Sequence, residues 1–324
     1  MCDSWSFLVP FPNTKVGPIR LQIAKLLKNW SSAPAPVIVR HMRILITNDD
    51  GITAPGLQVL ARNVARWIAE APDHEVREAI VVAPSVNHSG MSAAVGDVFS
   101  HPSVTYERHR IPGAESLVAY SLEAPPALCA ILGAVGSFEF QPDLILSGIN
   151  AGANVGRSVL HSGTIGAILT GAQLGLSGLA VSVQWGEDVH YDTAGEVAIE
   201  VLQELMNAPS RTLFNLNVPN LSAAEMKGVR RGRISRAGIV KSARPSIEGE
   251  ALGERGELSL RLGAATPDIG DVSDEDADED GALLVAGYAS LTPLRGPHED
   301  ADPGLDGLVH SALEAISRHL SKVR

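Results

Sequence analysis

Short apolar runs alternate with amphipathic segments along most of this chain, and no other feature restricts its fold as strongly. The runs occupy residues 44–46, 79–83, 144–146, 179–183 and 213–218. An apolar run of this length is typical of a strand that is buried on both faces of a parallel sheet. Residues 56–70 and 164–174 lie between such runs and predict helices. Strands that alternate with helices predict a right-handed, mostly parallel sheet in a three-layer α/β domain.

Composition divides the chain into four parts. We expect an atypical, flexible leader at 1–41, an α/β core at 42–221, an extension at 222–303 and a C-terminal helix at 304–324. Because Met42 stands directly before the first core strand, we interpret the basic leader as an addition to the domain; a membrane-surface or transit-like segment is the alternative. Within the extension, the acid-rich residues 268–280 predict a solvated, flexible loop, with a Ca²⁺ site as the alternative.

Charge and cysteine content argue against several classes of protein. A net charge of −11 and a pI near 5.4 speak against a nucleic-acid polymer as partner, because such binders carry a basic face. Small anionic substrates remain compatible, since a bound metal reverses the local field. No stretch is long and apolar enough to span a bilayer. The two cysteines, Cys2 and Cys129, imply no disulfide framework, so we expect a cytoplasmic location.

Two adjacent carboxylates, Asp49 and Asp50, follow the first predicted strand, and Gly51 marks the turn that ends it. In an open α/β sheet, ligands bind just outside the carboxyl ends of the strands. Two acids at that place repel one another and lose hydration, so they require a compensating cation. A divalent metal ion is the simplest such cation. The alternative is an Asx-type turn in which one solvated Asp caps a helix.

Three further polar loops follow predicted core strands and can converge on the same edge. Ser89 and Asn150 lie in two of them, and their side chains supply neutral oxygen donors. Together with Asp49 and Asp50 they make four oxygen ligands, which suit one Mg²⁺ or Mn²⁺ ion. The His and Cys spacing that is typical of zinc sites is missing from the sequence.

The third loop contains Ser162, Gly163 and Thr164 at the start of a predicted helix. Amides and a hydroxyl at a helix N-terminus can bind phosphate, and N-capping by Ser162 or Thr164 is the alternative. Asn154 is open to two interpretations in the same way, as an amide ligand or as a turn former.

The motifs in this order resemble the stationary-phase survival protein family, whose members are SurE-type 5′-nucleotidases. The resemblance rests on Arg-Ile-Leu-Ile-Thr-Asn-Asp-Asp-Gly-Ile-Thr-Ala-Pro-Gly at 43–56, Asn-His-Ser-Gly at 87–90 and Pro-Asp-Leu-Ile-Leu-Ser-Gly-Ile-Asn at 142–150. It runs from Met42 to about Leu294 and so covers most of the chain.

The resemblance implies a Rossmann-like core with a C-terminal β-hairpin extension that serves homodimer or homotetramer assembly. It also implies a metal-dependent phosphoric monoester hydrolase that acts on nucleoside 5′-monophosphates, and on 3′-monophosphates as well. Its metal ligands carry over to Asp49, Asp50, Ser89 and Asn150, with the two acids as catalytic residues. We assign substrate phosphate to Asn154 and to the Ser162, Gly163 and Thr164 element.

Three other classes of protein are rivals to this interpretation. A phospho-signalling receiver also has an acidic pair after its first strand, but it needs an acceptor Asp where this chain has Ser147 and Gly148. A dinucleotide dehydrogenase would need a Gly-x-Gly-x-x-Gly after a strand. A non-catalytic nucleotide-binding or assembly module on the same fold stays open, as does the choice between water and an Asp carboxylate as nucleophile.

Overall fold

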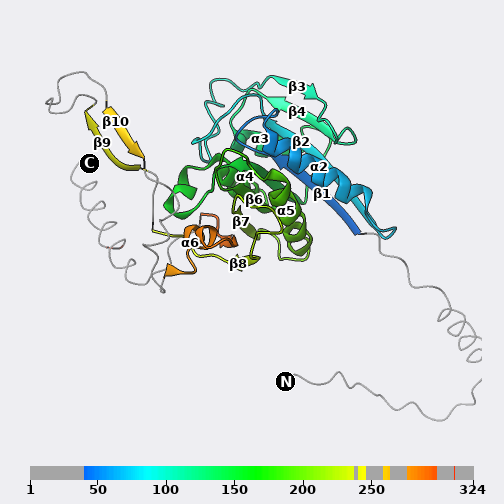
Figure 1. Cartoon of the computed structure of the whole chain (residues 1–324). Helices are drawn as coiled ribbons and strands as arrows, with labels where there is room; N and C mark the ends of the chain where they lie inside the picture. Colours follow the sequence, from blue (N-terminus) through cyan, green and yellow to red (C-terminus); the bar gives the residue numbers. More distant parts are fainter. Residues whose placement is uncertain (1–39, 237–239, 246–257, 263–275, 298–309, 311–324) are drawn as a thin grey trace, which may run out of the picture. The chain divides into compact units, whose positions relative to one another are not determined.

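The predicted apolar runs become the central strands of one nine-stranded sheet. The computed structural model describes residues 40–236, 240–245, 258–262, 276–297 and 310. The strands of the sheet are β1 (Arg40–Thr47), β2 (Glu75–Pro84), β3 (Tyr106–His109), β4 (Val118–Leu122), β5 (Leu144–Ala151), β6 (Ser177–Val183), β7 (Leu213–Val218), β8 (Val229–Arg231) and β11 (Ala289–Leu294). Their spatial order is β3-β4-β2-β1-β5-β6-β7-β11-β8 (Figure 1).

Most neighbouring strands in this sheet run parallel. The pairs β1–β5, β5–β6, β6–β7, β2–β4 and β11–β8 are parallel, whereas β3–β4 and β11–β7 are antiparallel. The predicted mostly parallel α/β fold is therefore confirmed.

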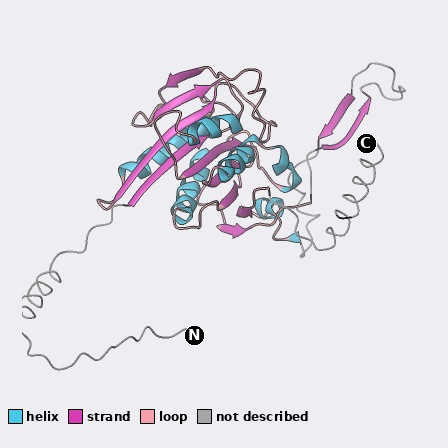
Figure 2. Cartoon of the chain, turned by 180° about the vertical axis from the view of Figure 1, so that it is seen from behind, coloured by secondary structure: helices cyan, strands magenta, loops and turns pink. Residues whose placement is uncertain are grey.

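Helices cover both faces of the sheet, as the views from opposite sides show (Figure 1, Figure 2). Helices α2 (Pro55–Ala69) and α5 (Tyr191–Leu205) contact each other and share one core cluster with the sheet. Helices α3 (Pro126–Ala134) and α4 (Gly163–Gln173) contact each other and share the second cluster. Two helical layers around one sheet make the predicted three-layer architecture.

Strand β1 shows why its sequence is apolar without alternation. Ile44 and Ile46 belong to the cluster that contains α2, whereas Leu45 belongs to the cluster that contains α3 and α4. All three side chains are fully buried. Since successive residues of a strand point to opposite faces, a strand between two helical layers needs an apolar residue at every position.

The strand order reverses beside β1, and this places the candidate site. The chain passes from β1 to β2 on one side and later returns to β5 on the other side. In open α/β sheets such a switch point leaves a crevice at the carboxyl ends of the two strands. The residues that follow β1 and those at the end of β5 therefore meet at one place.

Several boundaries differ from those expected. Strand β1 begins at Arg40, so the last two residues of the predicted leader belong to the core sheet. Helix α6 (Asp280–Val285) begins at the end of the predicted acidic loop, and Asp280 is 0% exposed. The prediction of a solvated loop is therefore wrong for Asp280, because this carboxylate accepts buried backbone N–H groups.

The C-terminal extension contains an antiparallel pair, β9 (Val240–Pro245) and β10 (Leu258–Leu262). This is the hairpin that the family resemblance implied. The leader before residue 40 and the terminal helix at 304–324, apart from residue 310, lie outside the described residues. None of the helices in the described part combines the length and the apolar character needed to cross a membrane.

The buried side chains of β1 permit a direct test of the three-layer arrangement. The substitution Leu45→Ala should lower the free energy of unfolding by about 2–5 kcal/mol, because it leaves a cavity between β1 and α3. Val135→Ala is the matched control, since Val135 is 57% exposed; it should change stability by no more than about 0.5 kcal/mol. Denaturant unfolding measures both values, and equal losses would contradict the proposed burial.

Candidate active site

Asp49 follows β1 and packs against the N-terminus of helix α4, and the residue is only 3% exposed. The Thr164 hydroxyl donates a hydrogen bond of 2.6 Å to Asp49 Oδ1, and the backbone amides of Gly163 and Thr164 bond the same carboxylate. A Cβ atom on Gly163 would stand 2.7 Å from Asp49 Cβ, so only glycine permits this approach. Burial raises the pKa of Asp49, while the bonds from Thr164 and Gly163 oppose that rise.

Asp50 is half-buried beside Asp49. Its Oδ1 accepts hydrogen bonds from Asn87 Nδ2 at 3.1 Å and from Ser89 Oγ at 3.5 Å, and the backbone of Ala151 also bonds its carboxylate. Burial, followed by the charge of Asp49, raises the pKa of Asp50 to about 6. The two carboxylates therefore resist simultaneous ionisation until a cation reaches them.

Asn150 completes the predicted oxygen set at the end of β5. Its Nδ2 donates to the carbonyl oxygen of Gly152 at 2.6 Å, which leaves the amide oxygen as an acceptor. The neighbouring residue, Ala151, is the one whose backbone bonds Asp50. The pairing of β5 with β6 shifts register between Ser147 and Asn150, so the strand changes course just where the polar residues begin.

The donor chemistry of this cluster fits a hard divalent cation. Asp49 and Asp50 have raised pKa values, the Ser89 hydroxyl contacts Asp50, and Asn150 offers an amide oxygen at the end of β5. Carboxylate, hydroxyl and amide oxygens are the ligands that Mg²⁺ and Mn²⁺ prefer. Within the described part of the chain, no three residues of the His, Cys, Asp and Glu types gather as a metal-binding group.

The structure resolves the role that Ser162 has in the helix. Its hydroxyl accepts a hydrogen bond from the backbone N–H of Ile165 at 3.2 Å, so Ser162 is the N-cap of α4. Thr164 is fully buried, and its hydroxyl is engaged with Asp49. Both side chains thus have structural partners, and phosphate binding by this element stays a prediction.

Asn154 lies in an asparagine network that our sequence reasoning did not identify. Its backbone N–H donates to Asn217 Oδ1 at 2.7 Å, and its carbonyl accepts from Asn215 Nδ2 at 2.8 Å and from Asn217 Nδ2 at 3.0 Å. Its own side chain donates to Ser182 Oγ at 2.8 Å. The signal was present in β7, because Asn215 and Asn217 are polar residues in a core strand and both are fully buried.

Tyr191 is a second residue that the sequence reasoning missed. It is the first residue of α5, and burial together with the charge of Asp50 raises the pKa of its hydroxyl. A Cβ atom on Gly56 would stand 1.9 Å from the carbonyl oxygen of Ile149 and 3.0 Å from Tyr191 Cε1. Glycine at position 56 therefore allows α2, β5 and Tyr191 to close around one side of the site.

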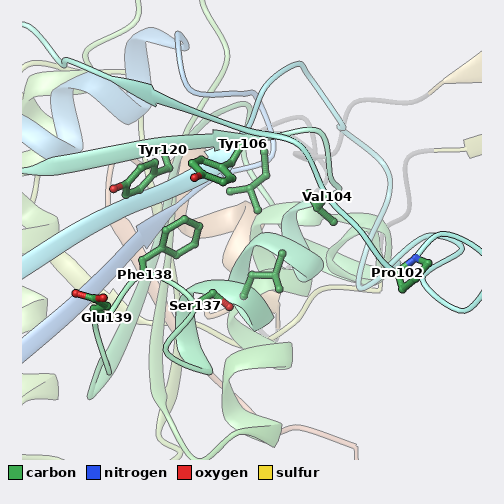
Figure 3. Close-up of a pocket in the computed structure, with 9 residues that line it drawn as sticks. Pro102, Val104, Tyr106, Tyr120, Ser137, Phe138 and Glu139 are labelled. Atoms are coloured by element: carbon green, nitrogen blue, oxygen red, sulfur yellow. The ribbon is translucent and has the colours of Figure 1, made fainter.

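A separate cavity of about 550 Å³ lies beside β3 and β4 (Figure 3). Aromatic side chains dominate its wall: Tyr120 and Phe138 stack with ring centroids 4.7 Å apart, and Tyr106 meets Tyr120 edge to face at 5.8 Å. None of the predicted catalytic, metal or phosphate residues lines this cavity. The predicted catalytic, metal and phosphate residues therefore lie away from this aromatic cavity.

The raised pKa of Asp50 predicts a pH dependence of stability. Its folded-state pKa of about 6 lies above its ordinary value of 3.8. The protonated group thus contributes stability that is fully present below pH 3.8 and is lost as the pH rises through about 6. In a chelator, unfolding of the wild type should therefore become easier across this window, whereas Asp50→Asn should show a flatter profile.

Unfolding midpoints in denaturant, recorded across that window, measure this difference. Asp73→Asn, at an exposed residue, is the control and should follow the wild type. Added Mn²⁺ should offset the loss in the wild type more than in Asp50→Asn. Parallel wild-type and Asp50→Asn profiles would show that Asp50 does not titrate in this way.

Comparisons with known proteins agree with this fold. The family model described as Survival protein SurE matches residues 44–241. The 5′/3′-nucleotidase SurE of Cronobacter sakazakii is 36% identical over 282 residues, which cover 86% of this chain and 97% of the relative. The 5′/3′-nucleotidase SurE of Salmonella arizonae is 36% identical over 284 residues, which cover 87% of this chain and 98% of the relative.

A solved structure shows the same likeness in three dimensions. The crystal structure of the SurE protein from Aquifex aeolicus superposes with a TM-score of 0.63 at 26% sequence identity, and the match covers 84% of this chain and 99% of that one. The matched range includes the four predicted metal ligands, Asp49, Asp50, Ser89 and Asn150. The chain therefore belongs to the SurE survival-protein family.

Proposed function

We propose that this protein is a divalent-metal-dependent phosphomonoesterase that hydrolyses nucleoside 5′-monophosphates, and also 3′-monophosphates, to nucleoside and phosphate. The observation that carries the proposal is the Asp49–Asp50 pair at the switch point of the sheet, with both carboxyl pKa values raised and neutral oxygen donors beside them. The names of the two relatives, 5′/3′-nucleotidase, support the choice of substrate class.

Asp49, Asp50, Ser89 and Asn150 would hold one Mg²⁺ or Mn²⁺ ion. When bound, such an ion acts as a Lewis acid on a phosphate oxygen and lowers the pKa of a water molecule. Helix α4 fixes the first of these ligands, because Thr164 and the amides at its N-terminus hold the Asp49 carboxylate. Metal affinity and ligand orientation therefore depend on residues that need not touch the ion.

Asp50 is the residue best suited to move a proton in this site. In the metal-free site its pKa is raised to about 6, and a bound cation would lower that value. Asp50 is also the more open of the two acids, so it is the one that a water molecule can reach. We assign it as the general base that takes a proton from water as the water oxygen attacks phosphorus. The ester bond between phosphorus and the nucleoside oxygen then breaks, and that oxygen takes the proton that Asp50 accepted, so the nucleoside leaves as an alcohol.

The other side of the site would bind the substrate phosphate. Asn154 is held by Asn215 and Asn217 of β7, and the N-terminus of α4 brings a positive dipole end. We assign the phosphate to Asn154 and the Ser162, Gly163 and Thr164 element. Gly163 and Thr164 also contribute through Asp49, which they hold in place.

Assembly and location follow from the same proposal. The β9–β10 hairpin would join copies of the chain into a homodimer or homotetramer, and the low cysteine content favours the cytoplasm. A non-catalytic phosphate-binding module is the alternative function. The two differ in one measurement, since only an enzyme releases phosphate repeatedly from its ligand.

The acidic pair gives the first test of activity. Asp50→Asn should reduce phosphate release by about 100-fold or more, because it removes both a metal ligand and the proposed base. The assay measures inorganic phosphate from nucleoside 5′- and 3′-monophosphates with Mg²⁺, Mn²⁺ or a chelator. Asp73→Asn serves as the control at an exposed carboxylate. Full activity of Asp50→Asn would refute the assignment, and wild-type inactivity under every metal would favour the binding module.

The Thr164 hydroxyl gives a test of ligand positioning. Thr164→Val keeps the shape of the side chain but removes the donor to Asp49, so Mn²⁺ affinity should fall by roughly 10- to 100-fold. Titration of the chelator-treated, metal-free protein with Mn²⁺ measures this affinity. Thr170→Val is the matched control on the same helix, since the Thr170 hydroxyl donates to the backbone carbonyl of Gly166 and not to Asp49. Equal Mn²⁺ affinity in the two variants would contradict the role of Thr164.

A further inference from the structure

A second buried carboxylate, Asp280, lies outside the proposed metal site. It is the first residue of α6 and is 0% exposed. Burial raises its pKa, and hydrogen bonds from the backbone oppose that rise. A carboxylate in such a place is costly unless its oxygens are well satisfied, so its partners indicate what it holds together.

The partners of Asp280 are backbone N–H groups from two distant parts of the chain. Gly156 donates to Oδ1 at 3.1 Å and to Oδ2 at 3.0 Å. Ser235 donates to Oδ1 at 3.1 Å, and Gly281 donates to the same oxygen at 2.9 Å. One carboxylate therefore joins the segment after β5 to the C-terminal extension.

The Gly156 end of this link leads directly to the substrate side of the site. Gly156 follows Asn154 by two residues and begins the 3-10 helix η1 (Gly156–His161). That helix ends at His161, directly before Ser162, which caps α4. All the residues that we assign to phosphate thus lie between Asn154 and Thr164, on a segment that Asp280 holds near its beginning.

The other end of the link is anchored in the core sheet. The backbone N–H of Asp280 donates to the carbonyl of Arg233 at 2.8 Å. Strand β11, which follows α6, pairs with β7, where Ser290 lies opposite Asn217. Asn217 is one of the residues that hold the backbone of Asn154. The extension therefore reaches the substrate segment by two routes.

We propose that Asp280 is a positioning residue for substrate phosphate, and that the C-terminal extension supports catalysis through it. The carboxylate fixes Gly156 and thereby the course of the 154–164 segment, while the Asp49–Asp50 side of the site depends on other contacts. This inference rests on the proposed function. Its distinctive consequence is that loss of Asp280 weakens substrate binding more than metal binding.

Asp280→Asn is a sharp test because, within the described residues, the donors to this carboxylate are all backbone N–H groups. Only Gly156 donates to Oδ2, so an amide that keeps its oxygen in the Oδ1 position turns its NH₂ toward the Gly156 N–H and weakens that link. Asp278→Asn is the control, since Asp278 is exposed and pairs with Arg233 through its side chain.

We expect Asp280→Asn to raise the KM for a nucleoside 5′-monophosphate by about tenfold, the effect of an unsatisfied buried donor. The kcat and the affinity for Mn²⁺ should stay within about threefold of the wild type, because no metal ligand changes. Asp278→Asn should match the wild type in all three. A residue that only stabilised the fold would lower the active fraction and leave KM unchanged, and that result would overturn the proposal.

If Asp280→Asn does not fold, hydrogen exchange of the wild type tests whether Asp280 links the extension to the 154–164 segment. With Mn²⁺ present, inorganic phosphate should slow exchange at residues 152–158 and also at 233–236 and 280–282, which lie at the far end of the link. Protection confined to the 152–158 segment would overturn the inference. A wild type that binds phosphate but releases none from any ester would refute the proposed function alone, so the two failures differ.

Discussion

The site depends first on the contact between the Asp49 carboxylate and the N-terminus of α4. A buried carboxylate needs donors, and the helix supplies the Thr164 hydroxyl together with two backbone amides. Gly163 makes the approach sterically feasible, because a side chain there would collide with Asp49. The same interaction caps the helix electrostatically. One contact thus fixes the orientation of an acidic residue and the position of the helix on the sheet.

This arrangement gives the adjacent acids different environments. Asp49 is almost fully buried and is held by the N-terminus of α4, whereas Asp50 is more open and accepts hydrogen bonds from Asn87 and Ser89. Burial and the charge of its neighbour raise the pKa of Asp50 to about 6. Two carboxylates with different surroundings can serve different roles. In our proposal Asp49 is a rigid ligand, and Asp50 is a ligand that also accepts a proton.

Much of the fold could be predicted because its signals are local. The apolar run at Ile44–Ile46 marks a strand buried on both faces, and the structure shows its side chains divided between two helical layers. The acidic pair, Ser89 and Asn150 could be predicted to meet, because strand ends in a parallel sheet share one edge. The neighbours of Asp50 agree with this, since Ser89 and the backbone of Ala151 both bond it.

The sequence by itself determined the class of fold, the residues with metal-binding chemistry and the family resemblance, because periodicity and residue type are encoded position by position. Only the tertiary structure decided what Thr164, Asn217 and Asp280 do. The sequence predicts that Asp280 is the last residue of an acidic, solvated loop. In the structure it is buried and bonds Gly156, which lies 124 positions away in the chain. Such roles depend on which donors a side chain meets after folding, and no local pattern records contacts between segments so far apart.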